Sequence, residues 1–496
     1  MENERGESNS PLFFYINALK KFFLLFCFIL ISCDNVMENK NFIIVFVDDM
    51  GYGDIASYGH PTIKTPNLDV MASEGQKWTQ FYSASSVCTP SRAALLTGRL
   101  PIRNGMIGKE QRVLFPNSEY GLPSTEITIS EKLRENGYRT AAIGKWHLGH
   151  KEDYLPTNHG FDYYYGIPYS NDMDEINGAT CCPGKRYWAQ YQSDDINSDN
   201  YNVPIIENTK IIERPANQKT ITKRFTDKAI DFIDKNKDDN FFIYLAHSMP
   251  HTPLYASENF YGKSKAGLYG DVIEEIDFNV GRIMKKLTDE NLEKNTIVVF
   301  TSDNGPWLPY DTHGGSAGLL REGKGTTWEG GQRVPGLFWG GSIKPGTIAE
   351  LGSTMDLFPT FLDFANIDIP KDRIIDGFSL KKTLTNHQTG DRKSILFYRQ
   401  REIYAARLNE YKAHFITQGA YEYNVSKYYN AKNYVLNNKK RVLKTPLLFN
   451  LNEDPSEKYD IAEENPEIIE KIKELVEKHN KDLNAPADLL SSRTEN

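Results

Sequence analysis

Several features are missing from the 496-residue sequence, and each absence excludes a class of protein. No apolar run reaches the roughly 18 residues that a membrane-spanning helix needs. The 58 Lys and Arg residues are outnumbered by 66 Asp and Glu, so the net charge is −8 and no basic field exists to collect nucleic acid. No internal repeat is visible. The composition predicts a globular protein without a nucleic acid partner and without several membrane spans.

Cysteine is also scarce, with five residues in the whole chain. Cys27 and Cys33 belong to an N-terminal apolar segment, which leaves Cys88 and the adjacent pair Cys181-Cys182. This number excludes a dense disulfide framework, so the stability has to come from a hydrophobic core. The adjacent pair is open to three interpretations: a strained disulfide, two free thiols, or part of a substrate loop.

The N-terminal segment has the pattern of a targeting signal. Two lysines precede the apolar residues 22–31, which are too few to span a bilayer but enough for the core of a signal peptide. Residues 30–33 read Leu-Ile-Ser-Cys and resemble the bacterial lipobox. We therefore expect residues 1–33 to be a signal peptide with a lipobox, and a lipid on Cys33 to anchor an exported periplasmic or cell-surface lipoprotein of a bacterium. The alternative is an ordinary secretory signal with an incidental cysteine.

Three runs of β-branched and aromatic residues are typical of strands buried on both faces of a sheet: residues 42–47, 241–246 and 296–301. Helical patterns separate them, at residues 128–136, 223–236 and 269–290. Strands that alternate with helices predict an α/β fold, with helices on both faces of one large sheet. Sites in such sheets gather where the strands end, and acidic or histidine residues follow each of these three.

The pattern changes near residue 394 to shorter strands and one long helix. Strand-like pieces occur at residues 395–398, 403–407, 411–416 and 447–451. Residues 466–480 form an amphipathic helix pattern, with Pro466 suited to its first turn. We expect a small antiparallel sheet that carries this helix, a boundary near residue 385, and disordered tails at residues 1–40 and beyond 485.

Residues 88–99 read Cys-Thr-Pro-Ser-Arg-Ala-Ala-Leu-Leu-Thr-Gly-Arg. Pro90 suits the first turn of a helix, so Cys88 would lie near the positive end of the helix dipole. Arg92 follows about one turn later and can return beside the thiol. The pattern predicts an activated cysteine at a helix start.

The chain is identified by these residues as similar to the formylglycine-dependent sulfatases of the alkaline phosphatase superfamily, of the arylsulfatase A and N-acetylgalactosamine-6-sulfatase type. The pattern Cys-x-Pro-Ser-Arg followed by Leu-Thr-Gly is the family's signature. Five further blocks resemble the family in the same order: residues 48–54, 144–149, 250–253, 301–305 and 323–331. The resemblance covers residues 41 to 480. It implies an alkaline-phosphatase-like large mixed sheet, a catalytic sulfatase domain over residues 41–385 and a C-terminal α+β subdomain over residues 386–485.

The resemblance also implies the chemistry of residue 88. In the family this Cys is oxidised to formylglycine, whose hydrate supplies a nucleophilic hydroxyl, so a formylglycine-generating or anaerobic sulfatase-maturating enzyme would be a partner. Asp48, Asp49, Asp303 and Asn304 follow two strands and offer hard oxygen ligands, which suit Ca²⁺ or Mg²⁺ better than zinc. The family's ion is usually calcium. The expected metal site therefore combines these four residues with residue 88.

Six residues match the family's catalytic positions: Cys88, Arg92, Lys145, His147, His251 and Lys324. Lys145 and Lys324 stand in glycine-flanked loops, where a cation can approach an anion closely. By resemblance, His251 with Lys324 protonates the leaving oxygen, and His147 removes a proton from the nucleophile. His247, four residues upstream, competes with His251 for its role.

The implied reaction is hydrolysis of a sulfate monoester, with exo-desulfation of a sulfated sugar or polysaccharide fragment as the expected use. The main competing hypothesis is a phosphate or phosphonate ester hydrolase of the same superfamily. Two further hypotheses are a carbohydrate-binding lipoprotein without activity and an unmodified cysteine hydrolase. Aromatic residues that can stack on sugars are Trp78, Tyr163 to Tyr165, Trp188, Trp307 and Trp328. Polar residues that can contact sugar hydroxyls are His159, Asp172, Asp174 and His313.

Overall fold

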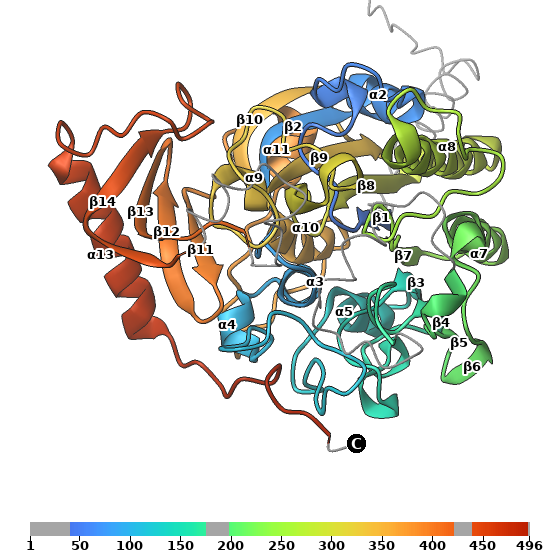
Figure 1. Ribbon diagram of the computed structural model, residues 1–496. Helices are drawn as coiled ribbons and strands as arrows, with labels where there is room; N and C mark the ends of the chain where they lie inside the picture. The colour runs from blue at the N-terminus through green and yellow to red at the C-terminus, as the bar shows by residue number, and fades with distance from the viewer. Residues whose placement is uncertain (1–39, 175–197, 421–438, 495–496) are drawn as a thin grey trace, which may run out of the picture. The chain divides into compact units, whose positions relative to one another are not determined.

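The computed structural model describes residues 40–174, 198–420 and 439–494 (Figure 1). The predicted signal peptide of residues 1–33, the Cys181-Cys182 pair and Trp188 lie outside these residues. The described chain contains a ten-stranded mixed sheet in the order β10-β2-β9-β8-β1-β7-β3-β4-β5-β6 and a separate four-stranded antiparallel sheet in the order β11-β12-β13-β14. The predicted fold class is confirmed.

The centre of the large sheet is parallel. It consists of β8 (Thr296–Ser302), β1 (Asn41–Val47), β7 (Phe241–Ala246) and β3 (Arg139–Lys145). The register pairs Val47 with Ser302, and Phe46 and Gly144 both with Ala246, so these four strands end level with one another. Three of the four are the strands expected from the sequence. Their carboxyl ends form one edge of the sheet, at the same height.

Six further strands complete the large sheet. They are β2 (Gln76–Tyr82), β9 (Arg333–Gly340) and β10 (Gly346–Ser353) on one side, and β4 (Tyr163–Ile167), β5 (Ile205–Glu207) and β6 (Lys210–Glu213) on the other. β4 is parallel to β3, whereas β9 runs antiparallel to both β8 and β2. The parallel centre is therefore flanked by mixed edges.

Strand β1 shows why both faces of the sheet are covered. Every one of its residues is buried, and side chains point alternately to opposite faces. Ile43 and Val45 enter one hydrophobic core, while Phe42, Ile44 and Phe46 enter the other. An uninterrupted apolar run thus supplies two cores at once, as expected for a central parallel strand.

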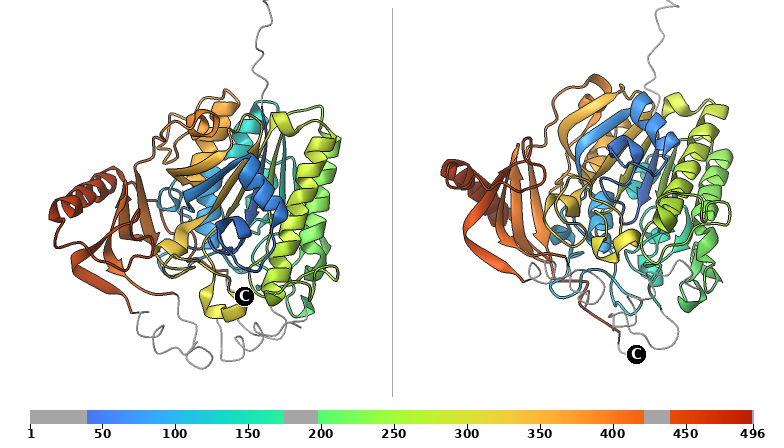
Figure 2. Two further views of the ribbon diagram at one scale, coloured as in Figure 1. Left: turned by 90° about the horizontal axis from the view of Figure 1, so that it is seen from above. Right: turned by 45° about the horizontal axis from the view of Figure 1, so that its top comes forward.

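Helices pack on each face. α2 (Pro66–Glu74), α7 (Ile221–Lys235) and α8 (Gly267–Asp289) cover the first core, and Figure 2 shows α7 and α8 side by side. α3 (Cys88–Thr97), α5 (Ile129–Glu135), α10 (Leu357–Phe364) and α11 (Lys381–Asn386) cover the second core. Thr128 and Glu131 form a capping box that begins α5. Within the described ranges, no helix is both long and apolar enough to cross a membrane.

The small sheet has two covered faces as well. Its strands are β11 (Ser394–Arg399), β12 (Glu402–Leu408), β13 (Tyr411–Thr417) and β14 (Arg441–Asn450). α13 (Pro466–Asp482) packs Ile469 and Ile472 against one face. On the other face, Phe397 packs with Tyr82 of β2, which joins the small sheet to the large one (Figure 1).

The expectation of a disordered tail beyond residue 485 is wrong for residues 486–494. Leu490 is fully buried in the second core, and its neighbour Leu489 donates its backbone N–H to the carbonyl of Gly105 at 3.1 Å. Arg493 forms a β-bridge with Ser118. Local composition cannot show this, because the order comes from a distant partner surface rather than from the tail itself.

A buried charged network joins the two sheets. Lys412 of β13 lies between two carboxylates, 2.9 Å from Glu329 and 3.1 Å from Glu457, and all three side chains are fully buried. Glu329 also accepts the Tyr82 hydroxyl at 2.5 Å. Burial disfavours its charge, but Lys412, Arg333 and Arg407 hold the pKa of Glu329 at about 2. The network fixes the small sheet against short helix α9 (Glu329–Gln332).

Replacing Lys412 with Met should strongly destabilise the protein. The substitution removes the buried cation that Glu329 and Glu457 share, and Glu329 keeps only Arg333 as an ion-pair partner, so the loss should be about 3–5 kcal/mol in free energy of unfolding. Urea denaturation measures this change. The matched control is Lys440→Met, because Lys440 and Glu402 form an exposed ion pair of the same sheet. It should lose less than about 1 kcal/mol. Equal losses in both variants would contradict a structural role for the buried network.

Candidate active site

The four central parallel strands bring their polar residues to one edge of the sheet. β1 is followed by Asp48 and Asp49, and β8 by Asp303 and Asn304. β3 ends at Lys145, with His147 just beyond, and the segment after β7 carries His251. Because these strands end level, residues more than 250 positions apart become neighbours; the Asp49 N–H donates to Asp303 Oδ1 at 3.1 Å. This edge is where sites occur in open α/β sheets.

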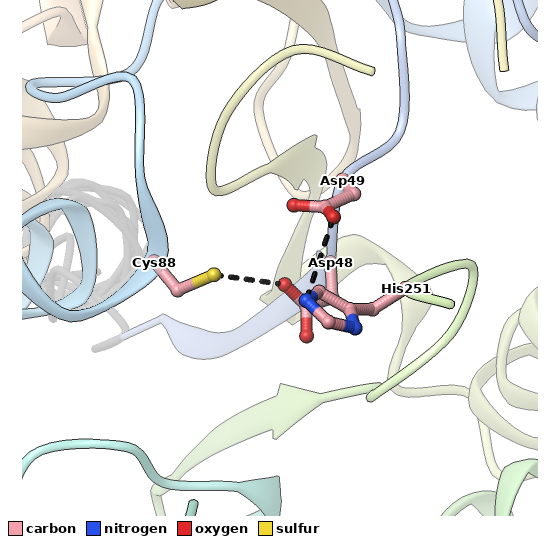
Figure 3. A group of neighbouring side chains, drawn as sticks. All are labelled: Asp48, Asp49, Cys88 and His251. Atoms are coloured by element: carbon pink, nitrogen blue, oxygen red, sulfur yellow. Dashed lines mark hydrogen bonds and ion pairs between the residues drawn. The ribbon is translucent and has the colours of Figure 1, made fainter. Parts of the chain in front are cut away.

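Cys88 enters this cluster from α3. It is the first residue of the helix, after Val87 in extended conformation, and Pro90 lies in the first turn as expected. Its thiol is 3.4 Å from Asp48 Oδ1. Figure 3 shows the thiol and the imidazole of His251 directed toward the carboxylates of Asp48 and Asp49. One ligand atom from each of these four residues lies within 4.8 Å of the others.

Asp48 is held by two cations. Lys145 pairs with Asp48 Oδ2, and Arg92 Nη2 lies 3.6 Å from Asp48 Oδ1. All three side chains are fully buried. Burial disfavours the charged carboxylate, but Lys145, His251 and Arg92 together hold the pKa of Asp48 well below its usual range. Lys145 is the last residue of β3 rather than a loop residue, so the expectation of a loop position is wrong for it.

Asp303 depends on the same arginine. Arg92 donates from Nε and Nη2 to Asp303 Oδ2 at 3.1 and 2.8 Å, and from Nη1 to the carbonyl of Lys145 at 2.8 Å. The guanidinium therefore ties the end of β8 to the end of β3. Burial and the neighbouring Asp48 carboxylate raise the pKa of Asp303, although Arg92 opposes the shift.

Asp49 contacts the loop that carries Lys324. Lys324 Nζ donates to Asp49 Oδ2 at 2.7 Å, and Asn304 Nδ2 donates to Asp49 Oδ1 at 2.7 Å. His251 Nε2 is 3.6 Å from the same Oδ2 atom. Burial raises the pKa of Asp49 and the Lys324 charge opposes the shift. Asp49 has a positive φ of 65°, a conformation to which Asp adapts more readily than most residues.

The residues of the cluster fit a hard divalent cation. Asp48, Asp49 and Asp303 are three buried carboxylates close together, and burial and the charge of Asp48 raise the pKa values of Asp49 and Asp303. Asn304 Oδ1 is buried and has no hydrogen-bond partner among the described residues. A carbonyl-type oxygen beside carboxylates is the ligand set that Ca²⁺ and Mg²⁺ prefer.

The Cys88 thiol does not have the environment of an activated cysteine. Burial and the carboxylates of Asp48 and Asp303 raise its pKa well above the usual value, although Lys145 and Lys324 oppose the shift. The expectation from the helix start is therefore wrong for the thiol itself. The helix dipole favours an anion at this position, but burial and the acidic residues at the strand ends, which come from elsewhere in the chain, outweigh it.

His147 has a defined tautomer. Its Nε2 lies 2.9 Å from the carbonyl oxygen of Leu114, which can only accept, so Nε2 carries the proton. Nδ1 is buried and has no partner among the described residues. Burial and the charge of Lys145 hold the pKa of His147 well below its usual value. The side chain thus presents a neutral, unprotonated nitrogen.

His251 and its competitor His247 lie in different surroundings. His251 Nδ1 donates to the carbonyl of Thr252 at 2.6 Å, which leaves Nε2 near Asp49 and 3.5 Å from Ser170 Oγ. His247 instead packs on Phe225, and burial lowers its pKa to about 4. His251 belongs to the cluster and His247 to the core, so His247 is excluded as its competitor.

A cavity of about 70 Å³ opens beside Cys88. Its described lining residues are Val87, Cys88, Arg112, Val113, Phe115, His147, Ser170, Asp172, Met173, His251, Trp307, Tyr310 and Lys324. Trp307 lies between two of them, with its ring 5.3 Å from that of His251 and 4.1 Å from Lys324 Nζ. The cavity thus combines an aromatic wall with a cation beside the nucleophile position.

The structure places few of the expected sugar contacts at this cavity. Trp307 and Asp172 line it, whereas Trp78, Tyr164 and Tyr165 are core residues. Three other candidates make contacts elsewhere. His159 stacks near Trp146, Asp174 accepts from Tyr169 and pairs with Arg214, and Trp328 packs on His414 of the small sheet. Tyr163 bonds Glu207, and His313 is buried in 3-10 helix η7 (Leu308–His313), outside the described lining.

Ser170 is a site residue that the sequence interpretation missed. Its hydroxyl accepts from Lys145 Nζ at 3.1 Å and lies near His251, so it connects two expected catalytic residues. It follows β4, which is parallel to β3. Because β4 also ends at this edge of the sheet, a polar residue that follows it could have been predicted as a site residue. Arg112 and Phe115 stand in irregular segments and Tyr310 in η7, and none of these segments gives a comparable signal.

Comparison with known proteins agrees with this geometry. The family model described as Sulfatase matches residues 40–367, and the one described as C-terminal region of aryl-sulfatase matches residues 390–496. The chain is 38% identical over 454 residues to human arylsulfatase A, covering 89% of this chain and 87% of that protein. It is 38% identical over 471 residues to human N-acetylgalactosamine-6-sulfatase, covering 89% and 86%.

Solved structures show the same likeness. The PsFucS1 sulfatase from Pseudoalteromonas sp. has a TM-score of 0.75 and 26% identity, covering 89% of this chain and 90% of that one. Ps i-CgsB in complex with k-i-k-neocarrahexaose has a TM-score of 0.69 and 30% identity, covering 89% and 92%. The chain belongs to the sulfatase family, and the prediction of a sulfuric ester hydrolase is confirmed.

Replacing Arg92 with Lys should weaken both stability and activity. A lysine keeps the charge but cannot make three directed bonds, so Asp303 and the carbonyl of Lys145 lose buried partners. We expect a loss of about 2–3 kcal/mol in free energy of unfolding, measured by urea denaturation. The control is Arg139→Lys at the opposite end of β3, where one exposed contact to Asp239 is involved. An Arg92 variant as stable as the control would show that the guanidinium does not tie the strand ends together.

Proposed function

We propose that this protein hydrolyses sulfate monoesters of a sulfated sugar or polysaccharide fragment, by exo-desulfation, at the cavity beside residue 88. The observation that carries the proposal is the position of Cys88. Its side chain stands at a helix start, within the carboxylate cluster, and lines a cavity that also receives Lys324, His147 and His251.

The charges of the cluster favour a singly charged ester. Three carboxylates, Asp48, Asp49 and Asp303, face three fixed cations, so their formal charges cancel. A bound divalent ion would add two positive charges, enough for the single charge of a sulfate monoester and for charge that develops on the leaving oxygen. The phosphate ester alternative carries a second charge and usually recruits a second metal ion. The described residues offer one ligand cluster.

Two groups complete the proposed site. Conversion of Cys88 to formylglycine would supply a hydroxyl nucleophile in place of a buried thiol, and Ca²⁺, or Mg²⁺, would polarise a sulfate oxygen. Asp48, Asp49, Asp303 and Asn304 would hold the ion, because their side chains already converge beside residue 88. The modifying partner would be a formylglycine-generating or anaerobic sulfatase-maturating enzyme.

The two histidines have different roles in this proposal. His147 offers the unprotonated Nδ1 and takes a proton from the residue-88 hydroxyl. Burial and the charge of Lys324 hold the pKa of His251 well below its usual value, so Nε2 would take up its proton only with the bound anionic ester and would then protonate the leaving oxygen together with Lys324. Lys145 is fixed between Asp48 and Ser170 and contributes charge rather than a proton.

A carbohydrate substrate is supported by the cavity and by the relatives. Trp307, Tyr310 and Phe115 give the cavity an aromatic side suited to a sugar face. One related structure is a complex with k-i-k-neocarrahexaose. The name given to another concerns the metabolism of multiple glycosaminoglycans by Bacteroides thetaiotaomicron. An exported lipoprotein anchored through Cys33 would meet such polysaccharides at the cell surface or in the periplasm.

The matured protein should release nitrophenol from 4-nitrophenyl sulfate with a kcat/KM at least about 100-fold above that for 4-nitrophenyl phosphate. The reason is that a site with one divalent ion suits the single negative charge of the sulfate ester better than the two charges of the phosphate ester. Both rates are followed by absorbance. Faster turnover of the phosphate ester would overturn the proposal.

The control for this measurement is residue 88 itself. Mass spectrometry of the peptide that contains it should show an aldehyde in active protein, and Cys88→Ala should lose sulfate ester turnover while the fold remains. A fully active protein with an ordinary thiol at position 88 would contradict the proposed nucleophile.

A divalent ion should stabilise the fold. Binding at a concentration 100 times the dissociation constant adds about 2.7 kcal/mol, which raises the melting temperature by several degrees. Differential scanning fluorimetry with chelator and then with added Ca²⁺, Mg²⁺ or Zn²⁺ measures the shift. Asp49→Asn should reduce the shift, whereas the exposed control Asp391→Asn should keep it. No shift with any ion in the wild-type protein would contradict the metal site.

A further inference from the structure

Thr89 directly follows the nucleophile position, and its hydroxyl contacts two segments that reach the active site from elsewhere in the chain. The side chain is fully buried in the first turn of α3. Its Oγ1 donates to the carbonyl of His147 at 3.0 Å and accepts the backbone N–H of Leu114 at 3.1 Å. Neither contact belongs to the helix itself. The proposed sulfatase reaction assigns no role to this hydroxyl.

The contacts of Thr89, Leu114 and His147 form a closed ring. The carbonyl of Leu114 accepts the Nε2 proton of His147 at 2.9 Å, while the N–H of the same leucine donates to Thr89. Thr89 in turn donates to the carbonyl of His147. The hydroxyl therefore contacts the backbone of the proposed base directly, and it reaches the imidazole through one intervening residue.

His147 needs this support because its backbone conformation is uncommon. Its φ of 58° lies in the left-handed region, which non-glycine residues adopt rarely and keep only where their surroundings hold them. Within the described chain, three hydrogen bonds hold the residue: its N–H donates to the carbonyl of Pro168 at 3.1 Å, its carbonyl accepts from Thr89, and its ring donates to Leu114. Two of the three involve Thr89 or its partner Leu114.

A threonine side chain suits this position chemically. A hydroxyl has one proton to donate and lone pairs that accept, so it satisfies a carbonyl and an N–H at the same time. His147 and Leu114 are both buried, where a backbone group that loses its partner is costly. Branching at Cβ restricts the rotation of the side chain, so the hydroxyl keeps its direction. Thr89 is thus a rigid link between two separate segments.

We propose that Thr89 is a positioning residue of the sulfatase reaction, which acts through His147 by holding its neutral imidazole beside residue 88. The proposal rests on the proposed function, because His147 serves as a base only in that reaction. Since Thr89 adjoins residue 88 in the chain, the start of α3 fixes both the nucleophile and the base. A misplacement of about 1 Å can lower a rate about 100-fold, so the anchoring of His147 affects kcat.

Thr89→Val tests the proposal, because valine keeps the shape of the side chain and removes the hydroxyl. Turnover of 4-methylumbelliferyl sulfate by the matured protein should fall at least about tenfold in kcat. Thr89→Ser retains a hydroxyl and should keep kcat within about threefold of the wild type, although serine holds it less rigidly. The control Thr226→Val removes a buried hydroxyl that donates to the Thr222 carbonyl at 3.1 Å in α7, and it should leave kcat unchanged.

Two features of the measurement exclude other causes. Thr89 adjoins the residue that has to be modified, so each rate is divided by the fraction of aldehyde at residue 88, measured by mass spectrometry. The comparison uses kcat rather than kcat/KM, because Val113 and Phe115 adjoin Leu114 and line the cavity, where a shift can change KM. If valine disturbs folding by placing a methyl group against two polar groups, Thr89→Ala removes the hydroxyl without that methyl group.

A double-mutant cycle with His147→Ala separates positioning from general stability. If Thr89 acts through the imidazole, Thr89→Val should change kcat by less than about twofold once that imidazole is absent. A loss that is equally large with and without the imidazole would overturn the proposal. A Thr89→Val protein with the kcat of the wild type would overturn it as well.

The outcomes separate this inference from the proposed function. A matured wild-type protein that does not hydrolyse 4-methylumbelliferyl sulfate would contradict the sulfatase proposal. Wild-type hydrolysis that is insensitive to the Thr89 hydroxyl would leave that proposal intact and overturn only the positioning role.

Discussion

The structure depends on one electrostatic constraint: three carboxylates are buried together and have to be neutralised where the central strands end. Arg92 neutralises Asp303 and, together with Lys145, Asp48. Lys324 neutralises Asp49. These cations come from α3, β3 and a distant loop. The need to neutralise the buried carboxylates therefore brings three separate segments of the chain together. Burial without such partners would cost several kcal/mol for each charge.

The small sheet completes this arrangement from the outside. Lys412 of β13 holds Glu329, which lies five residues after Lys324 in the same segment, and Trp328 between them packs on His414. The loop that contains Lys324 is thus held at its C-terminal end by the small sheet. The C-terminal part therefore has a role in positioning as well as in covering the core.

The sequence predicts the site residues correctly where they directly follow a buried strand or belong to a short motif. The polar residues after β1 and β8 were expected at one edge because both runs have the pattern of buried parallel strands, and α3 begins at Cys88 as Pro90 indicated. It failed where the surroundings of a side chain come from distant segments. The thiol of Cys88 is surrounded by carboxylates of other strands, and Trp328 packs against the small sheet instead of the cavity.

Apolar periodicity and short motifs are local properties of the chain, and they are enough to predict the α/β fold class, the principal strands and helices, and the set of chemically capable residues. Which of those residues meet depends on how the whole chain folds. The neutral tautomer of His147, the separation of His251 from His247, the part played by Ser170 and the order of residues 486–494 all depend on contacts between remote segments. Such contacts are set by packing and charge across the whole fold, and no local pattern contains them.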